Sequence, residues 1–171
     1  MEEVGFTPVQ EQETPKQRPT FLTVLCILSW ISAVWTVVSS SIALSSKDDS
    51  LEKLEDEISN INEAANVEEM PSFFQSFMDS SLVTIQDSIN NFMLINSSNL
   101  VLYLAQIFAV YLMFNLNKKG FWLYTFVQVA LLIFPFSYMT LNTVFIITVL
   151  FAGLLTLAFI IMYATNLKHM K

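Results

Sequence analysis

The sequence predicts an all-α membrane protein with four transmembrane helices and an extracytoplasmic helical hairpin between the first and the second of them. Of its 171 residues, 54% are apolar and 13% are charged, and this charged share is about half that of a typical soluble domain. The apolar residues gather in four long runs that contain no Asp, Glu, Lys, Arg or His. Because lipid offers backbone amides no water to bond, such runs cross it as helices.

Residues 1–20 are rich in Glu, Gln, Thr and Pro, a composition typical of disordered chain, and we interpret them as a cytoplasmic tail. Residues 21–44 are the first predicted span, because an uncharged run of this length exceeds the ~30 Å hydrocarbon core at ~1.5 Å per residue. The alternative is a signal peptide cleaved near Ser45-Ser46. The run is much longer than the ~7–15 apolar residues of a signal peptide and follows an acidic tail, which favours a span.

Residues 45–96 form the only large polar segment, and we interpret them as an acidic extracytoplasmic loop that holds 11 acidic and 2 basic residues. Its first half has apolar residues at steps of three and four, which indicates an amphipathic helix: Leu51, Leu54, Ile58, Ile61 and Ala65. Its second half repeats the pattern: Phe74, Met78, Leu82, Ile85, Ile89 and Phe92. A turn is predicted at 66–70, and Pro71 suits the first position of the second helix.

Two arrangements of this loop remain open at the level of sequence. Because no Pro or Gly separates either arm from the span that it joins, the economical structure is an upright antiparallel hairpin that continues both spans and protrudes ~30–35 Å. In the alternative, the second arm lies on the membrane surface with Phe73, Phe74 and Phe77 among the lipid headgroups.

The rest of the chain alternates spans and short connections. The third apolar run fades after Phe134, where Pro135 intervenes. We predict a second span at 97–116, a cytoplasmic turn at 117–120, a third span at 121–136, a short outer loop at 137–142, a fourth span at 143–165 and a cytoplasmic tail at 166–171.

The basic residues predict the orientation. Six of the eight Lys and Arg residues fall where a four-span chain shares one side: Lys16, Arg18, Lys118, Lys119, Lys168 and Lys171. The excess of Lys and Arg in cytoplasmic segments makes that side the cytoplasm. We therefore expect a multi-pass protein of the cytoplasmic (inner) membrane with both termini inside the cell.

Gln106 and Gln128 are the two glutamines within the predicted spans. Counted from the turn at 117–120, their depths in an antiparallel helix pair differ by only ~5 Å. One interpretation is a structural clasp between the two amides, worth roughly 0.6–2 kcal/mol. The other is the polar lining of a pore or a ligand pocket. Small residues four apart also predict close packing of helices: Ser29 with Ala33, Ala105 with Ala109, and Ala152 with Thr156.

Several functional classes lack support in the sequence. A net charge of −7 argues against nucleic acid as a partner, since phosphate binding needs clustered Lys and Arg. Cys26 is the single cysteine, so no disulfide forms within the chain. Asp48-Asp49-Ser50 does not continue into a calcium-loop pattern, and His169 suits a solvated interfacial position. We expect no cofactor, no metal and no enzymatic activity.

Two stretches, 18–28 and 117–124, the latter followed by Gln128, together resemble a group of small uncharacterised inner-membrane proteins of Bacteroidota-type bacteria. The match covers about a fifth of the chain. The resemblance implies a bacterial cytoplasmic membrane and a four-span chain with a long first outer loop, and it supplies neither an activity nor functional residues.

The leading functional prediction is a non-enzymatic accessory, scaffold or sensor subunit whose outer hairpin binds a partner. The residues expected to make that contact are Leu54, Ile58, Phe74, Phe77 and Met78. The alternative is an oligomeric channel or carrier subunit with Gln106 and Gln128 near the path. The expected partners are the lipid bilayer and either another membrane or extracytoplasmic protein or further copies of this chain.

Overall fold

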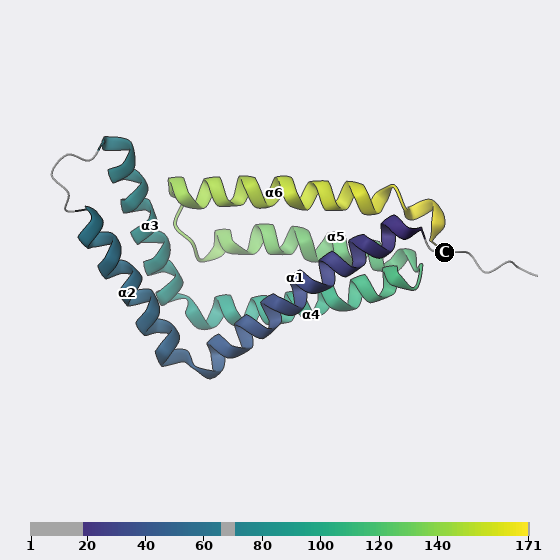
Figure 1. Cartoon of the computed structure of the whole chain (residues 1–171), viewed down its shortest axis with the longest axis horizontal. Helices are drawn as coiled ribbons and strands as arrows, with labels where there is room; N and C mark the ends of the chain where they lie inside the picture. The colour runs from purple at the N-terminus through teal and green to yellow at the C-terminus, as the bar shows by residue number, and fades with distance from the viewer. Residues whose placement is uncertain (1–18, 66–70, 171) are drawn as a thin grey trace, which may run out of the picture.

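A computed structural model describes residues 19–65 and 71–170 of the chain (Figure 1). All regular elements among these residues are helical, which confirms the predicted all-α class. In chain order they are α1 (Thr20–Ser45), α2 (Lys47–Ala65), α3 (Ser72–Asn90), α4 (Phe92–Phe114), α5 (Lys118–Ile133), the 3-10 helix η1 (Phe134–Ser137), α6 (Thr143–Ala164) and the 3-10 helix η2 (Leu167–His169). Most of the predicted tail 1–20 and the predicted turn 66–70 lie outside the described residues.

Four of the described helical segments are long and apolar enough to cross a membrane, and they indicate a multi-pass membrane protein. They are Thr20–Ser45, Phe92–Phe114, Lys118–Ser137 and Thr143–Ala164. Pro135 lies in the 3-10 turn that follows α5, where its missing N–H costs no helical hydrogen bond. α4 begins at Phe92, before the predicted boundary at residue 97.

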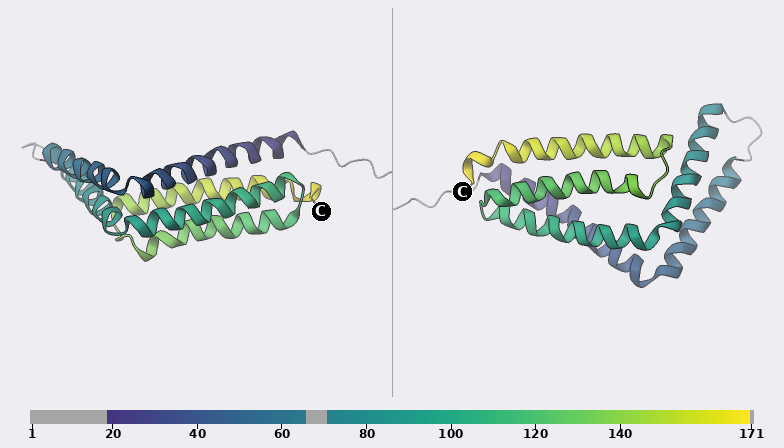
Figure 2. Two further views of the ribbon diagram at one scale, coloured as in Figure 1. Left: turned by 90° about the horizontal axis from the view of Figure 1, so that it is seen from below. Right: turned by 180° about the vertical axis from the view of Figure 1, so that it is seen from behind.

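The spanning helices form an open bundle. α4, α5 and α6 lie side by side in chain order, and α1 crosses α4 diagonally on one face (Figures 1 and 2). α1 and α5 both pack closely on α4, whereas α6 makes fewer contacts with its neighbours. We call the end where α1 begins and α6 finishes the terminal end, and the end that carries α2, α3 and the α5–α6 connection the loop end.

The buried core lies toward the terminal end. It is built from side chains of all four spanning helices and the C-terminal segment: Leu22, Leu25, Cys26, Ala109, Val110, Met113, Phe121, Tyr124, Tyr163 and Met170. α6 contributes to this core near its C-terminal end, where Tyr163 is buried. Its other buried residue, Phe145, lies near its N-terminal end and outside the core. The rest of the chain therefore buries little of the middle of α6.

Gly120 fixes how closely α4 and α5 approach each other beside their connecting turn. A Cβ at this position would lie 2.6 Å from the backbone nitrogen of Met113 and 2.7 Å from the carbonyl oxygen of Ala109. Only glycine permits this backbone contact, as in other tightly packed membrane helices. Asn117 caps α5, since its side chain accepts a hydrogen bond of 3.0 Å from the backbone nitrogen of Lys119.

α2 and α3 lie side by side and run across the loop end of the bundle (Figures 1 and 2). They do not continue α1 and α4 in line, because the chain bends at Ser46 (φ −116°, ψ 55°) and at Asn91 (φ −110°, ψ 19°). The upright arrangement expected from the absence of Pro and Gly is therefore not adopted. The side chain of Asn91 explains this bend. Its amide donates one hydrogen bond to the carbonyl oxygen of Asp87 and another to that of Tyr138, which is far away in the sequence.

Candidate functional site

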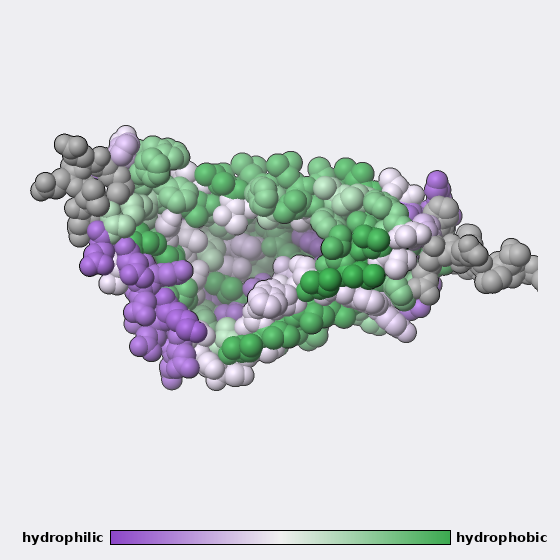
Figure 3. Space-filling view, viewed as in Figure 1, coloured by the Kyte–Doolittle hydropathy of each residue, from purple (hydrophilic) through white to green (hydrophobic). Residues whose placement is uncertain are grey.

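A cleft separates α1 from α6. The two helices meet near the terminal end, where the hydroxyl groups of Ser29 and Tyr163 share a buried hydrogen bond of 2.9 Å, and they diverge toward the loop end (Figure 1). α4 and α5 line the floor of the resulting gap. In the space-filling view this face is hollowed, and paler and polar residues are visible between the strongly apolar ridges of the helices (Figure 3).

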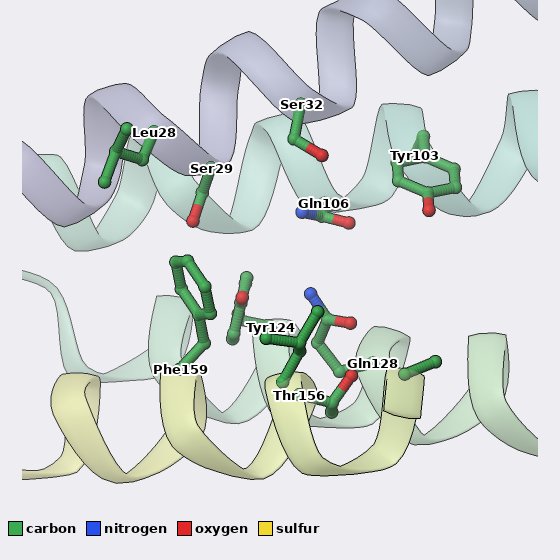
Figure 4. Close-up of a pocket in the computed structure, with 11 residues that line it drawn as sticks. Leu28, Ser29, Ser32, Tyr103, Gln106, Tyr124, Gln128, Thr156 and Phe159 are labelled. Carbon is green, nitrogen blue, oxygen red and sulfur yellow. The ribbon is translucent and has the colours of Figure 1, made fainter. Parts of the chain in front are cut away.

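Two adjoining cavities make up the cleft. The first, of about 260 Å³, lies nearer the terminal end and is lined by Leu28, Ser29, Ser32, Tyr103, Gln106, Tyr124, Gln128, Ala152, Leu155, Thr156 and Phe159 (Figure 4). The second, of about 320 Å³, reaches the loop end and is lined by Thr84, Asn99, Tyr103, Gln128, Leu131, Leu132, Pro135, Tyr138, Met139, Phe145, Thr148, Val149, Ala152 and Thr156. The two share Tyr103, Gln128, Ala152 and Thr156, so they form one continuous groove.

The polar lining follows from helical spacing. Tyr103 and Gln106 stand three apart on α4, and Tyr124 and Gln128 stand four apart on α5, so each pair shares one face of its helix. Hydroxyl groups from α1 and α6 complete the lining. Neither cavity is lined by Asp, Glu, Lys, Arg or His, so the groove offers neutral hydrogen-bonding groups only.

Gln106 and Thr125 each carry a buried side-chain oxygen without a hydrogen-bond partner among the described residues, and of the two Gln106 lines the groove. Its side chain is 3% exposed, and its Oε1 atom accepts no hydrogen bond from any described residue. The structure places Gln106 and Gln128 in the lining of the same cavity (Figure 4), and the Oε1 atom of Gln106 makes no hydrogen bond to Gln128. A buried acceptor left unpaired costs roughly 1–3 kcal/mol.

Aromatic rings close the terminal end of the groove. The rings of Tyr124 and Tyr163 stack edge to face with centroids 4.9 Å apart, and the Tyr163 hydroxyl bonds Ser29 of α1. Beyond them lies the close-packed core that includes Leu22 and Met113. The groove therefore ends at these rings and does not continue through the bundle.

α3 covers the other end of the groove through side-chain contacts to the α5–α6 connection. Asn142 donates a hydrogen bond of 3.0 Å to the Thr84 hydroxyl, and it also caps α6 by accepting one of 2.9 Å from the Phe145 nitrogen. Asp87 accepts a hydrogen bond of 2.6 Å from the backbone nitrogen of Thr140. Burial raises the pKa of the Tyr138 phenol above its usual range, which keeps this cavity-lining group neutral.

The residues predicted to bind a partner fall into two groups. Leu54, Ile58 and Met78 are half-buried, and α2 packs chiefly against α3, so they belong to the seam between these helices. Phe74 and Phe77, in contrast, are 55% and 41% exposed. The acidic residues of α2 are all exposed: Asp48, Asp49, Glu52, Glu55, Asp56, Glu57 and Glu63.

The residues predicted to set the orientation are described only in part. Lys118 and Lys119 begin α5, Lys168 lies in η2, and all three are exposed at the terminal end. Lys16, Arg18 and Lys171 lie outside the described residues.

Sequence reasoning missed several groups of the site. Tyr103 and Ser32 were not singled out, although each stands three residues from a polar neighbour in an apolar run, which is a readable signal. The spacing of Ala152 and Thr156 predicts a packing pair, whereas in the structure both residues line the groove. The contact between Thr84 and Asn142 joins residues that are far apart in the sequence, so no local sequence pattern predicts it.

No family model, curated protein or solved structure matches this chain. Among the described residues no group of three or more His, Cys, Asp or Glu side chains is placed to hold a metal ion.

Proposed function

We propose that this protein is a membrane accessory or sensor subunit without enzymatic activity, whose α2–α3 hairpin binds a partner protein outside the cytoplasm. The observation that supports it best is the attachment of α3 to the bundle. Thr84, Asp87 and Asn91 each bond the segment between α5 and α6. This attachment holds the hairpin in a defined position, and a preorganised surface loses less entropy on binding.

The charge of α2 suits a basic partner. Its carboxylates are exposed, while its apolar row is occupied by α3. An acidic surface speeds encounter with a basic one and selects against acidic partners. Phe74 and Phe77 are exposed near the start of α3, and exposed aromatic side chains are typical anchors of protein interfaces.

The location of the hairpin is part of the proposal. Lys118, Lys119 and Lys168 are exposed at the terminal end, and the excess of basic residues favours the cytoplasm for that end. The hairpin at the loop end would then face outward. A bacterial cytoplasmic membrane is the setting that the resemblance implies.

Affinity capture of the full-length protein from its native membrane, after mild cross-linking, tests this function. The variant Glu52→Lys/Asp56→Lys reverses charge on the exposed face of α2, and Glu52→Asp/Asp56→Glu keeps the charge as a matched control. We expect a partner that the wild type and the control retain and that the reversed variant loses. The same captured proteins from all three chains, or none from any, would refute the proposal.

The alternative, an oligomeric channel or carrier subunit, is favoured by one observation: Gln106 and Gln128 line a shared cavity. The closed terminal end of the groove speaks against a continuous path through one chain. Solute flux into liposomes tests it, with Gln106→Leu as the informative variant. Flux equal to that of empty vesicles, or flux that Gln106→Leu leaves unchanged, removes this alternative.

A further inference from the structure

We propose that the groove between α1 and α6 binds an uncharged membrane lipid with a free hydroxyl group, of which diacylglycerol is the simplest representative. The lipid enters sideways from the bilayer. This site is independent of the partner surface on α2 and α3. Four features of the groove support this ligand: an open acceptor, a neutral lining, a suitable size and an entrance that faces the bilayer.

The open acceptor calls for a hydrogen-bond donor. Gln106 lines the first cavity, and its buried Oε1 atom accepts no bond from the described residues. In lipid no bulk water is present to satisfy it. A hydroxyl group donates one hydrogen bond and accepts others, so it pairs with this oxygen and also with nearby hydroxyl groups such as that of Ser32. A carbonyl or ether group alone leaves Gln106 unpaired.

The lining calls for a neutral ligand. Both cavities are free of acidic and basic side chains. Bringing a phosphate or an ammonium group to this depth removes its hydration without supplying an opposite charge, which is strongly unfavourable. The groove therefore discriminates against charged phospholipid headgroups and in favour of lipids whose polar part is a hydroxyl.

The size and polarity of the groove fit an amphiphile. Cavities of about 260 and 320 Å³ adjoin, and small-molecule sites commonly span ~300–1,000 Å³. The first cavity holds the polar cluster around Gln106 and Gln128. The second adds aliphatic side chains on α5 and α6, namely Leu131, Leu132 and Val149, against which an acyl chain packs.

The entrance faces the bilayer. Ser32 on α1 and Ala152 on α6 line the groove and are exposed, and beside them Leu28 and Leu155 are 49% and 50% exposed. The hollow on this face of the molecule is visible in Figure 3. A lipid in the membrane thus reaches Gln106 without leaving the hydrocarbon phase.

Photolabelling of the full-length protein in phosphatidylcholine vesicles tests the proposal. The probe is a diacylglycerol with a diazirine in one acyl chain. Two matched probes carry the same chain, one with its hydroxyl acetylated and one with a phosphocholine headgroup. We expect the diacylglycerol probe to label peptides of α1, α5 and α6 along the groove, unlabelled diacylglycerol to compete, and the matched probes to label these peptides far less. Equal labelling by all three probes would show a gap filled by bulk lipid and overturn the proposal.

Variants separate recognition from structure. Gln106→Leu removes the acceptor, so we expect about tenfold weaker competition by diacylglycerol, equivalent to 1.4 kcal/mol. The unfolding midpoint of the ligand-free protein should not fall, because the substitution removes a buried acceptor that has no hydrogen-bond partner and is itself destabilising. Ala152→Trp fills the groove and should abolish labelling, whereas Ala158→Trp, at an exposed position of α6 outside the lining, should not. Unchanged competition in Gln106→Leu, or a second copy of the chain cross-linked across the groove, would overturn the proposal.

Discussion

Replacing Gly120 by alanine offers a sharp test of how the bundle is packed. The added Cβ would lie 2.6 Å from the Met113 nitrogen, 2.7 Å from the Ala109 oxygen and 2.8 Å from the Leu112 Cβ. Ordinary contact begins at 3.4 Å, so α4 and α5 must separate locally by roughly 0.8 Å in the variant, because backbone atoms cannot rotate away. Overpacking of this kind costs ~1–3 kcal/mol.

Gly153→Ala is the matched control. A Cβ there would meet only the Leu132 Cδ2 atom, at 3.5 Å, which is an ordinary contact with the end of a flexible side chain. The higher helix propensity of alanine, up to ~1 kcal/mol, favours both variants, so comparing them isolates the clash. Unfolding by SDS in mixed micelles, followed by the fluorescence of Trp122 and the other tryptophans, measures both free energies. We expect Gly120→Ala to be clearly destabilised and Gly153→Ala to match the wild type. Equal stability of the two variants would refute the close approach of α4 and α5.

Three further predictions concern the polar contacts and the orientation. In a double-mutant cycle measured by SDS unfolding, Ser29→Ala and Tyr163→Phe should show a coupling of about 0.6–1.7 kcal/mol; additive effects would mean that their hydrogen bond contributes nothing. Asn142→Ala should lower the free energy of unfolding by about 1 kcal/mol, because α6 loses its cap. The same variant should speed hydrogen exchange in α3, because the contact with Thr84 is lost. Unchanged exchange would contradict the attachment of α3. An impermeant maleimide should label Glu57→Cys in intact cells but Lys118→Cys only after permeabilisation, and the reverse pattern would invert the proposed orientation.

The sequence predicts the helices well because their signals are local. The uncharged runs are long enough to cross lipid, and the apolar row that includes Leu54 and Ile58 has helical spacing. In the structure these two residues are half-buried while the acidic residues between them are exposed. Each of these properties depends on residues within a few turns of one another, which is the range over which hydrophobic periodicity is informative.

The direction of α2 and α3 could not be predicted, because contacts between distant residues set it. No Pro or Gly near Asn91 predicts the bend there. The bend depends instead on the side-chain amide of Asn91, which donates a hydrogen bond to the carbonyl oxygen of Tyr138. The attachment of Thr84 to Asn142 is equally remote in sequence. Gly120 was predicted as part of a turn, and its packing role becomes visible only when α4 lies beside α5.

The same reasoning explains why the sequence leaves open whether Gln106 forms a clasp or lines a ligand site. An amide within an apolar run finds a partner on a neighbouring helix if the bundle is closed. Here α6 is buried only at Phe145 and Tyr163, and polar contacts hold it near both ends, through Asn142 and through the Tyr163 hydroxyl. Lipid supplies no hydrophobic force that draws the middle of such a helix inward. The groove therefore stays open to the bilayer, and what enters it meets an acceptor that the protein itself leaves unpaired.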